Sequence, residues 1–249
     1  MIINSLENKK IKKYASLKTN KGRIENGLFL LEGMHLVEEA FKHNLLVDIL
    51  LLEGNSLSFV PDMEITYVNE AILKKVSNLI NYSNVIGICK TFDNKDIIGD
   101  RLLVLDNIQD PGNLGTIIRS ACAFNVDTII LSNDTVDLYN DKVIRSTQGM
   151  LFHINIVSRD LIELIPNLKK DGYLILGTNV KNGTPVSEIN SNKYALIMGN
   201  EGHGVKEEIT FMCDKNLYVK MNNNCESLNV GVATSILLYE LNKRSLWNK

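Results

Sequence analysis

Short apolar runs alternate with helical patterns along most of this 249-residue chain. In the first half, apolar runs fall at about 29–33, 47–52, 65–68 and 84–90, and helical periodicity at 34–43 and 71–79. In the second half, strands are expected at 102–105, 128–132, 152–157, 173–177, 194–198 and 216–220, and helices at about 113–124, 141–149, 160–170, 206–213 and 229–245. Strands that alternate with helices predict an α/β fold with a mostly parallel sheet covered on both faces.

The stretch 91–100 between the two halves is polar and has no clear periodicity. It is predicted to be a linker, and a length of 249 residues suits two domains of ordinary size. We therefore expect an N-terminal α/β domain over 1–95 and a second domain over 101–249.

The composition bears on where the protein works and on whether it holds disulfides or metal ions. No apolar run approaches the roughly 18–20 residues that cross a bilayer, and the N-terminus lacks the apolar core of a signal peptide. The four cysteines contain no C-x-x-C pair and the four histidines are scattered, so neither a disulfide frame nor a metal site is expected. A cytoplasmic protein that binds no metal and no membrane is the expectation.

The N-terminal 25 residues are strongly basic in an otherwise nearly neutral chain. They hold seven cations against two glutamates, and the cations are Lys9, Lys10, Lys12, Lys13, Lys18, Lys21 and Arg23. Taken alone, such a run favours a solvated helix face. It would attract phosphate if the rest of the chain called for a polyanion.

Glycine and small polar residues gather after four strands of the second half. The segments are 106–115, 178–183, 199–204 and 221–229. Ligands of open α/β sheets bind beyond the carboxyl ends of the strands, so these segments predict one ligand site. Each could also be an ordinary turn or helix cap. Neither the G-x-G-x-x-G nor the Walker phosphate loop is present, which argues against a standard nucleotide cradle.

Three motifs in these segments resemble those of the SpoU/TrmH family of RNA ribose 2′-O-methyltransferases. They are Asn113-x-Gly115-x-x-x-Arg119, Met198-Gly199-Asn200-Glu201-Gly202 and Ser227-Leu228-Asn229-Val230. The first half is similar to the substrate-binding domain of that family, which resembles a small ribosomal RNA-binding protein. The residues that carry this second likeness are Asn8, Ile11, Lys12, Leu17, Arg23 and 29–33. One departure is Gly231, where many relatives carry serine.

The resemblance implies a fold that the residue patterns alone do not predict. In that family the C-terminal part of the sheet domain forms a deep trefoil knot, an exception to the usual absence of threading. S-adenosylmethionine binds in the loops of the knot, and the chains pair as homodimers through the first and last helices of the knotted domain. Carried over to this sequence, the cofactor-binding residues are Thr178, Gly199, Val219, Met221 and Leu228.

The same resemblance makes Arg119 the catalytic residue, supported by Asn113, Glu201, Ser227 and Asn229. A guanidinium is almost always protonated, which conflicts with the role of general base. Three accounts remain open: a desolvated arginine acting as base, a cation that stabilises the developing alkoxide, or a ligand for an RNA phosphate that takes the proton. Asn113 is expected to orient Arg119 or the ribose, and Glu201 to pair with Arg119 or hold a substrate hydroxyl.

Lys9, Lys12, Lys13 and Arg23 are the expected contacts to the RNA backbone. Large-subunit rRNA is the favoured substrate, because a separate RNA-binding domain fits the rRNA enzymes of the family. The alternatives are a tRNA 2′-O-methyltransferase and a non-catalytic RNA-binding or ribosome-assembly protein of the same fold.

Overall fold

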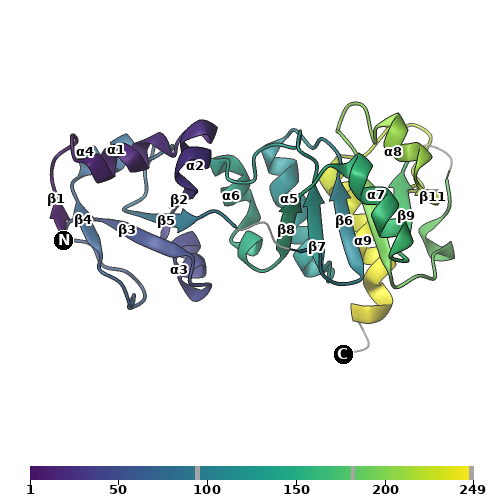
Figure 1. The fold of residues 1–249 in the computed structure, drawn as a ribbon, viewed down its shortest axis with the longest axis horizontal. Coiled ribbons are helices and arrows are strands. Elements are labelled where there is room, and N and C mark those ends of the chain that lie inside the picture. The colour runs from purple at the N-terminus through teal and green to yellow at the C-terminus, as the bar shows by residue number, and fades with distance from the viewer. Residues whose placement is uncertain (93–95, 181–182, 247–249) are drawn as a thin grey trace. The chain divides into compact units, whose positions relative to one another are not determined.

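The computed structural model describes residues 1–92, 96–180 and 183–246, and residues 93–95 of the predicted linker lie outside that part. The chain divides into two compact units. The first contains Met1–Asp93 and Asp137–Phe152, and the second contains Asn94–Val136 and His153–Lys249. Figure 1 shows the elements of each unit.

The first unit is built on a five-stranded mixed sheet. Its strand order is β1 (Ile2–Ile3), β4 (Thr66–Val68), β3 (Leu46–Leu52), β5 (Val85–Lys90) and β2 (Leu28–Glu32). β5 runs antiparallel to both neighbours, whereas β1 and β3 pair with β4 in parallel. The remaining elements of this unit are α1 (Lys9–Ser16), α2 (Asn20–Asn26), α3 (Met34–Lys42), α4 (Glu70–Val76), α6 (Asp141–Thr147) and the 3₁₀ helix η1 (Met150–Phe152).

The second unit is built on a six-stranded sheet in which every pairing is parallel. Its strand order is β11 (Lys215–Leu217), β9 (Leu174–Thr178), β10 (Tyr194–Met198), β6 (Arg101–Leu105), β7 (Thr128–Leu131) and β8 (Asn155–Ser158). The other elements are α5 (Pro111–Ala123), α7 (Leu161–Lys170), η2 (Val186–Glu188), α8 (Glu207–Phe211) and α9 (Val230–Leu246). The prediction of an α/β fold with a mostly parallel sheet is confirmed, and the knot stays a prediction.

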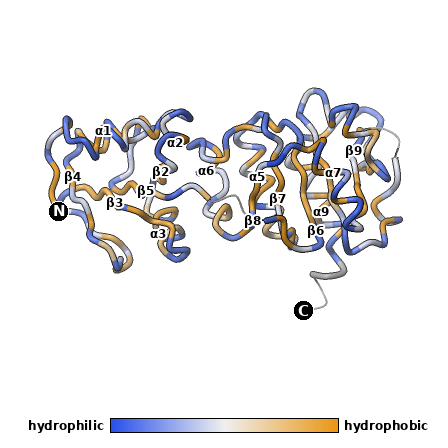
Figure 2. Tube along the Cα trace, viewed as in Figure 1, coloured by the Kyte–Doolittle hydropathy of each residue, from blue (hydrophilic) through white to orange (hydrophobic). Residues whose placement is uncertain are grey.

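Burial explains the sequence pattern of the second sheet. Residues 102–105 of β6 are fully buried, because β6 lies in the interior of the sheet between β10 and β7. A parallel strand covered on both faces reads as a continuous apolar run rather than as an alternating one. The interior strands are accordingly drawn mainly in the hydrophobic colour in Figure 2.

Several helices begin where the sequence supplies a capping side chain. The Asp110 carboxylate accepts a hydrogen bond of 2.9 Å from the backbone N–H of Asn113, and Pro111 occupies the first turn of α5. Asn8, Asn69, Asn140 and Asp160 cap α1, α4, α6 and α7 in the same way. The polar residues that follow the strands therefore fix where the helices start.

Several predicted boundaries differ from those observed. The strand expected at 152–157 is Asn155–Ser158, because Phe152 ends the 3₁₀ helix η1. The strand expected at 216–220 ends at Leu217. Helix α6 lies within the predicted second domain but packs against β2 of the first unit. The two compact units therefore each contain two segments of the chain. The domain boundaries 1–95 and 101–249 stay a prediction.

Candidate active site

The loops that follow β6 and β10 leave the sheet side by side. Leu105 and Met198, the last residues of these strands, are paired in register, and the backbone N–H of Asp106 donates to the Met198 carbonyl over 2.9 Å. Further along, the Asn200 side-chain amide donates to the Asn107 carbonyl over 2.9 Å. The predicted meeting of these segments at one sheet edge is observed.

Glu201 joins the loop after β10 to the start of α5. One carboxylate oxygen accepts from the side-chain amide of Asn113 at 2.9 Å and from the backbone N–H of Asp110 at 3.1 Å. The other oxygen accepts from the backbone N–H of Gln109 at 3.2 Å. A carboxylate held by donors that precede a helix is favourably placed, because those N–H groups carry partial positive charge.

The hydrogen bonds to Glu201 also set its protonation state. Partial burial favours the neutral acid, but the Asn113 amide and the backbone donors favour the carboxylate more strongly. The net effect lowers the pKa of Glu201 below its ordinary value of 4.5. Glu201 is therefore a weaker base than an ordinary carboxylate, and it acts here as a structural acceptor.

Asn113 and Asn229 connect the remaining motif to this network. The Asn229 amide donates to the Asn113 side-chain oxygen over 2.8 Å, and the Asn229 oxygen accepts from the backbone N–H of Gly231 at 2.9 Å. Both polar atoms of the Asn113 side chain are thus engaged. Asn113 bridges Glu201 and Asn229, and neither side chain has a hydrogen bond to Arg119. The alternative roles expected for them, contacts to the ribose or to a substrate hydroxyl, stay predictions.

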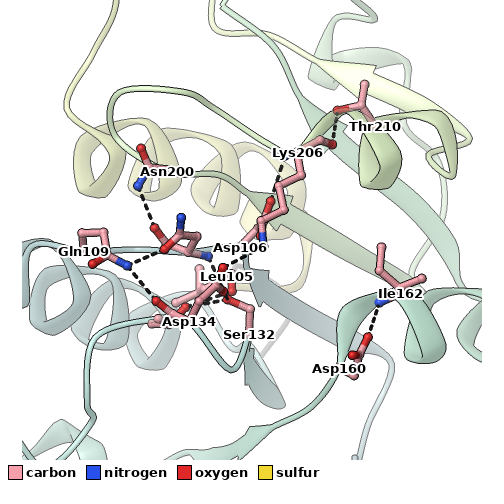
Figure 3. Close-up of polar contacts among 12 residues, drawn as sticks. Leu105, Asp106, Gln109, Ser132, Asp134, Asp160, Ile162, Asn200, Lys206 and Thr210 are labelled. Carbon is pink, nitrogen blue, oxygen red and sulfur yellow. Dashed lines mark hydrogen bonds and ion pairs between the residues drawn. The ribbon is translucent and has the colours of Figure 1, made fainter.

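Lys206 also connects the loop after β10 to the loop after β6, as Figure 3 shows. Its backbone N–H donates to the buried Asp106 carboxylate over 2.8 Å, and its ammonium pairs with Asp134 at 2.7 Å and with Asp106 at 3.5 Å. The hydrogen bond to Asp134 is the main reason why the pKa of Lys206 is raised. The residue patterns did not predict this cluster, although Asp106 directly follows the apolar run 102–105.

Gly199 is required by the close packing of the loop after β10. A Cβ at this position would lie 2.1 Å from backbone atoms of Gly204 and Val205. Asn200 pairs with Gly204 through two backbone hydrogen bonds of 2.9 Å. The segment thus folds back on itself, and only glycine permits that approach.

A pocket of about 750 Å³ opens among these loops. This volume falls within the roughly 300–1,000 Å³ of small-molecule sites. Apolar side chains and exposed backbone both contribute to its wall, as a ligand with an aromatic base and polar groups requires. The predicted residues that line it are Asn113, Thr178, Gly199, Glu201, Val219, Met221, Ser227, Leu228 and Asn229. His203 and Tyr218 also line it and were not predicted.

Arg119, the catalytic residue that the family resemblance implies, does not face the pocket of its own chain. It is exposed and does not line the pocket, and its side chain forms no hydrogen bond or ion pair with other described residues. It lies six positions after Asn113, and at 3.6 residues per turn the two side chains point about 120° apart around the helix. Arg119 therefore lies on a different face of α5 from the pocket.

The predicted RNA contacts of the first unit divide into two groups. Lys9, Lys12 and Lys13 are exposed on α1, with Lys12 paired to Glu7. Arg23 is only 7% exposed, and its guanidinium donates to Asp137 at 2.6 Å and to the Leu17 carbonyl at 3.0 Å. The guanidinium is engaged inside the unit, so this structure does not favour Arg23 as an RNA contact.

Two family models match this chain. The SpoU rRNA methylase family covers residues 100–239, and the MRM3-like substrate binding domain covers residues 8–87. The chain is 38% identical over 243 residues to the 23S rRNA (guanosine(2553)-2′-O)-methyltransferase RlmP of Bacillus subtilis, with 96% of this chain and 98% of RlmP covered. The chain belongs to the SpoU rRNA methylase family.

Solved structures agree with this membership in the SpoU family. An AdoMet-bound rRNA methyltransferase from Sinorhizobium meliloti is 26% identical with a TM-score of 0.83, and the match covers 98% of each chain. A crystal structure of an RNA 2′-O ribose methyltransferase is 27% identical with a TM-score of 0.80, covering 99% of this chain and all of that one. In the described part of this chain, no helix has the length and apolar character needed to span a membrane.

Proposed function

We propose that this protein transfers a methyl group from S-adenosylmethionine to a ribose 2′-hydroxyl of large-subunit rRNA. The observation that carries the proposal is the larger pocket, which residues of all three family motifs line and which the Glu201–Asn113–Asn229 hydrogen bonds hold together. The identity to RlmP over nearly the full length of both chains supports rRNA as the substrate class. We also propose that the protein acts in the cytoplasm, where ribosomes are assembled.

The pocket residues fit S-adenosylmethionine. Thr178, Val219 and Leu228 line a wall that mixes apolar side chains with loop backbone, and the tight turn at Gly199 shapes its edge. When bound, the cofactor supplies an electrophilic methyl group. The chain's own contribution is to orient the hydroxyl beside it, and orientation alone can supply about 7–11 kcal/mol of the barrier reduction.

Glu201 and Asn113 hold the loops in place rather than exchange protons. Glu201 accepts three hydrogen bonds and its pKa is lowered, so it is a poor proton acceptor. Ser227 is exposed at the pocket and is free to meet a ribose hydroxyl. The proton of the 2′-hydroxyl then passes to an RNA phosphate or to solvent, with Arg119 as the stabilising cation.

A homodimer would supply the cation that one chain's pocket lacks. α9 packs on α5 through the Ser120–Ser235 hydrogen bond of 2.7 Å, and a side chain at Gly231 would crowd Thr116 at 3.1 Å. Beside this contact α9 exposes Val232, Ile236 and Tyr239, an apolar stripe at helical spacing. We propose that two copies pair through this face and that each Arg119 serves the pocket of the other chain.

The test is methyl transfer from labelled S-adenosylmethionine to 23S rRNA and, separately, to tRNA. Label in 23S rRNA that is lost in the Arg119→Ala variant, while cofactor binding persists, is the expected result. Label in tRNA alone would contradict the proposal that rRNA is the substrate. Absence of cofactor binding would instead favour a non-catalytic RNA-binding protein.

A further inference from the structure

A second, smaller pocket of about 410 Å³ borders the first one. Both pockets are lined by Asn200, residues 203–205 and Thr210, so the loop after β10 forms their common wall. The second pocket alone is also lined by Asn107, Lys206 and Glu207. A ligand group in this pocket would therefore be a close neighbour of a ligand in the larger one.

Most polar groups of the second pocket are already committed. The Asn200 amide donates to the Asn107 carbonyl, and its oxygen accepts from the backbone N–H groups of Gly202 and His203 at 2.9 and 3.1 Å. The Lys206 ammonium is held by Asp134 and Asp106, and the Thr210 hydroxyl donates to the Lys206 carbonyl over 3.1 Å (Figure 3). These groups build the pocket but have little capacity left for a ligand.

Glu207 and His203 remain available. Both are exposed, and neither side chain forms a hydrogen bond or ion pair with other described residues. Glu207 adds a third carboxylate to those of Asp106 and Asp134, against the single ammonium of Lys206. A phosphate would be repelled here, whereas a group that donates hydrogen bonds to a carboxylate would be attracted.

We infer that this pocket receives the guanine base of the nucleotide whose ribose is methylated, with Glu207 and His203 reading its Watson–Crick edge. Guanine alone among the four RNA bases presents two adjacent donors, N1–H and the N2 amine, beside an acceptor, O6. A carboxylate accepts both donors at once, and an imidazole N–H donates to O6. The inference rests on the proposed function and adds the residues that select the base.

The position of the pocket suits this role. A base and the 2′-hydroxyl of the same nucleoside are joined through one sugar, so the base must lie next to the site of methyl transfer. The shared wall, residues 203–205, provides that adjacency. The cluster of Lys206 with Asp106 and Asp134 keeps this wall fixed.

The test uses the full-length protein and an rRNA segment carrying guanosine or inosine at the mapped methylated position. Inosine lacks only the N2 amine. The wild-type protein should lose at least about 10-fold in kcat/KM on the inosine RNA, as expected for a bidentate base contact. Glu207→Gln should lose a similar factor on the guanosine RNA and discriminate between the two RNAs by less than about threefold, with S-adenosylmethionine affinity unchanged.

Glu208→Gln is the matched control, since Glu208 is exposed on the same helix but lines neither pocket. It should behave as wild type. Equal wild-type rates on the two RNAs, a methylated position that is not guanosine, or full discrimination retained by Glu207→Gln would each overturn the inference while leaving methyl transfer intact. Failure to methylate any rRNA would overturn the proposed function itself.

Discussion

The side-chain amide of Asn113 donates a hydrogen bond of 2.9 Å to the carboxylate of Glu201, across 88 positions of sequence. This bond joins the first turn of α5 to the loop after β10. Because Asn113 also accepts from Asn229, one residue ties together the three motifs that line the pocket.

Replacing Asn113 by alanine should weaken this junction. Loss of a hydrogen bond to a charged group costs about 1–2 kcal/mol, which corresponds to a fall in Tm of roughly 2–8 °C for a chain of this size. Asn113→Asp should be worse than alanine, although it is closer in size, because it places a second carboxylate against Glu201. Thermal unfolding compares the variants, and a milder effect of aspartate would contradict the assigned bond.

The Glu201 carboxylate should stabilise the protein only above acidic pH. Its folded pKa is lowered from 4.5, so its contribution is fully present above about pH 4.5 and is lost as pH falls through the folded pKa. The difference in Tm between wild type and Glu201→Gln should therefore be large at pH 7 and shrink below pH 4.5. A difference that grows on acidification would have the wrong sign for this account.

Gly199 and Gly202 offer a matched pair in one loop. Gly199→Ala forces a Cβ to within 2.1 Å of backbone atoms, whereas a Cβ at Gly202 meets only the Asn200 side-chain oxygen at 3.6 Å. Gly199→Ala should lower S-adenosylmethionine affinity at least about 10-fold and lower Tm, since the loop must open. Gly202→Ala should leave Tm within about 2 °C of wild type. Calorimetric titration and thermal unfolding measure both.

Arg23 and Lys13 should separate stability from RNA binding. Arg23→Ala removes the guanidinium from Asp137, whose side chain is 22% exposed and keeps the Asn20 amide and the Tyr139 backbone N–H as donors. Losing hydrogen bonds to this charged group should cost about 1.5–3 kcal/mol. Lys13→Ala removes an exposed charge, so Tm should not change, while rRNA affinity falls and the slope of log K against log salt decreases by about one phosphate contact. If Arg23→Ala were as stable as wild type, its structural role would be wrong.

Mixing two inactive variants should restore activity if Arg119 serves the partner's pocket. Arg119→Ala lacks the cation, and Leu228→Trp fills the pocket. Each mixed dimer then contains one complete site, so coexpressed chains should regain about a quarter of wild-type activity. No recovery, with dimers demonstrated by light scattering, would show that each Arg119 serves its own chain.

The fold was largely accessible from sequence because its strongest signals are local. The apolar run of 102–105 predicts a buried parallel strand, and Asp110 with Pro111 marks the start of α5. The edge of a parallel sheet then brings the polar loops together. Family resemblance supplied the pocket residues, which the loops alone would not have distinguished from ordinary turns.

The remaining features depend on contacts between distant residues. In the sequence, Arg23 is indistinguishable from the other basic residues near the N-terminus. Only the folded chain shows that its side chain is buried and paired with Asp137. The side on which Arg119 projects follows from the face of α5 that the core occupies. The Lys206 cluster joins loops that follow three different strands, and no spacing in the sequence indicates it.

The most direct test of the central claim is the chemical position of the methyl group. After incubation of 23S rRNA with the protein and labelled S-adenosylmethionine, alkaline hydrolysis cleaves each linkage through its free 2′-hydroxyl. A 2′-O-methylated ribose blocks that cleavage, so the account predicts label in an alkali-stable dinucleotide, absent when Arg119→Ala is used. Label released in mononucleotides would place the methyl group on a base and contradict the account.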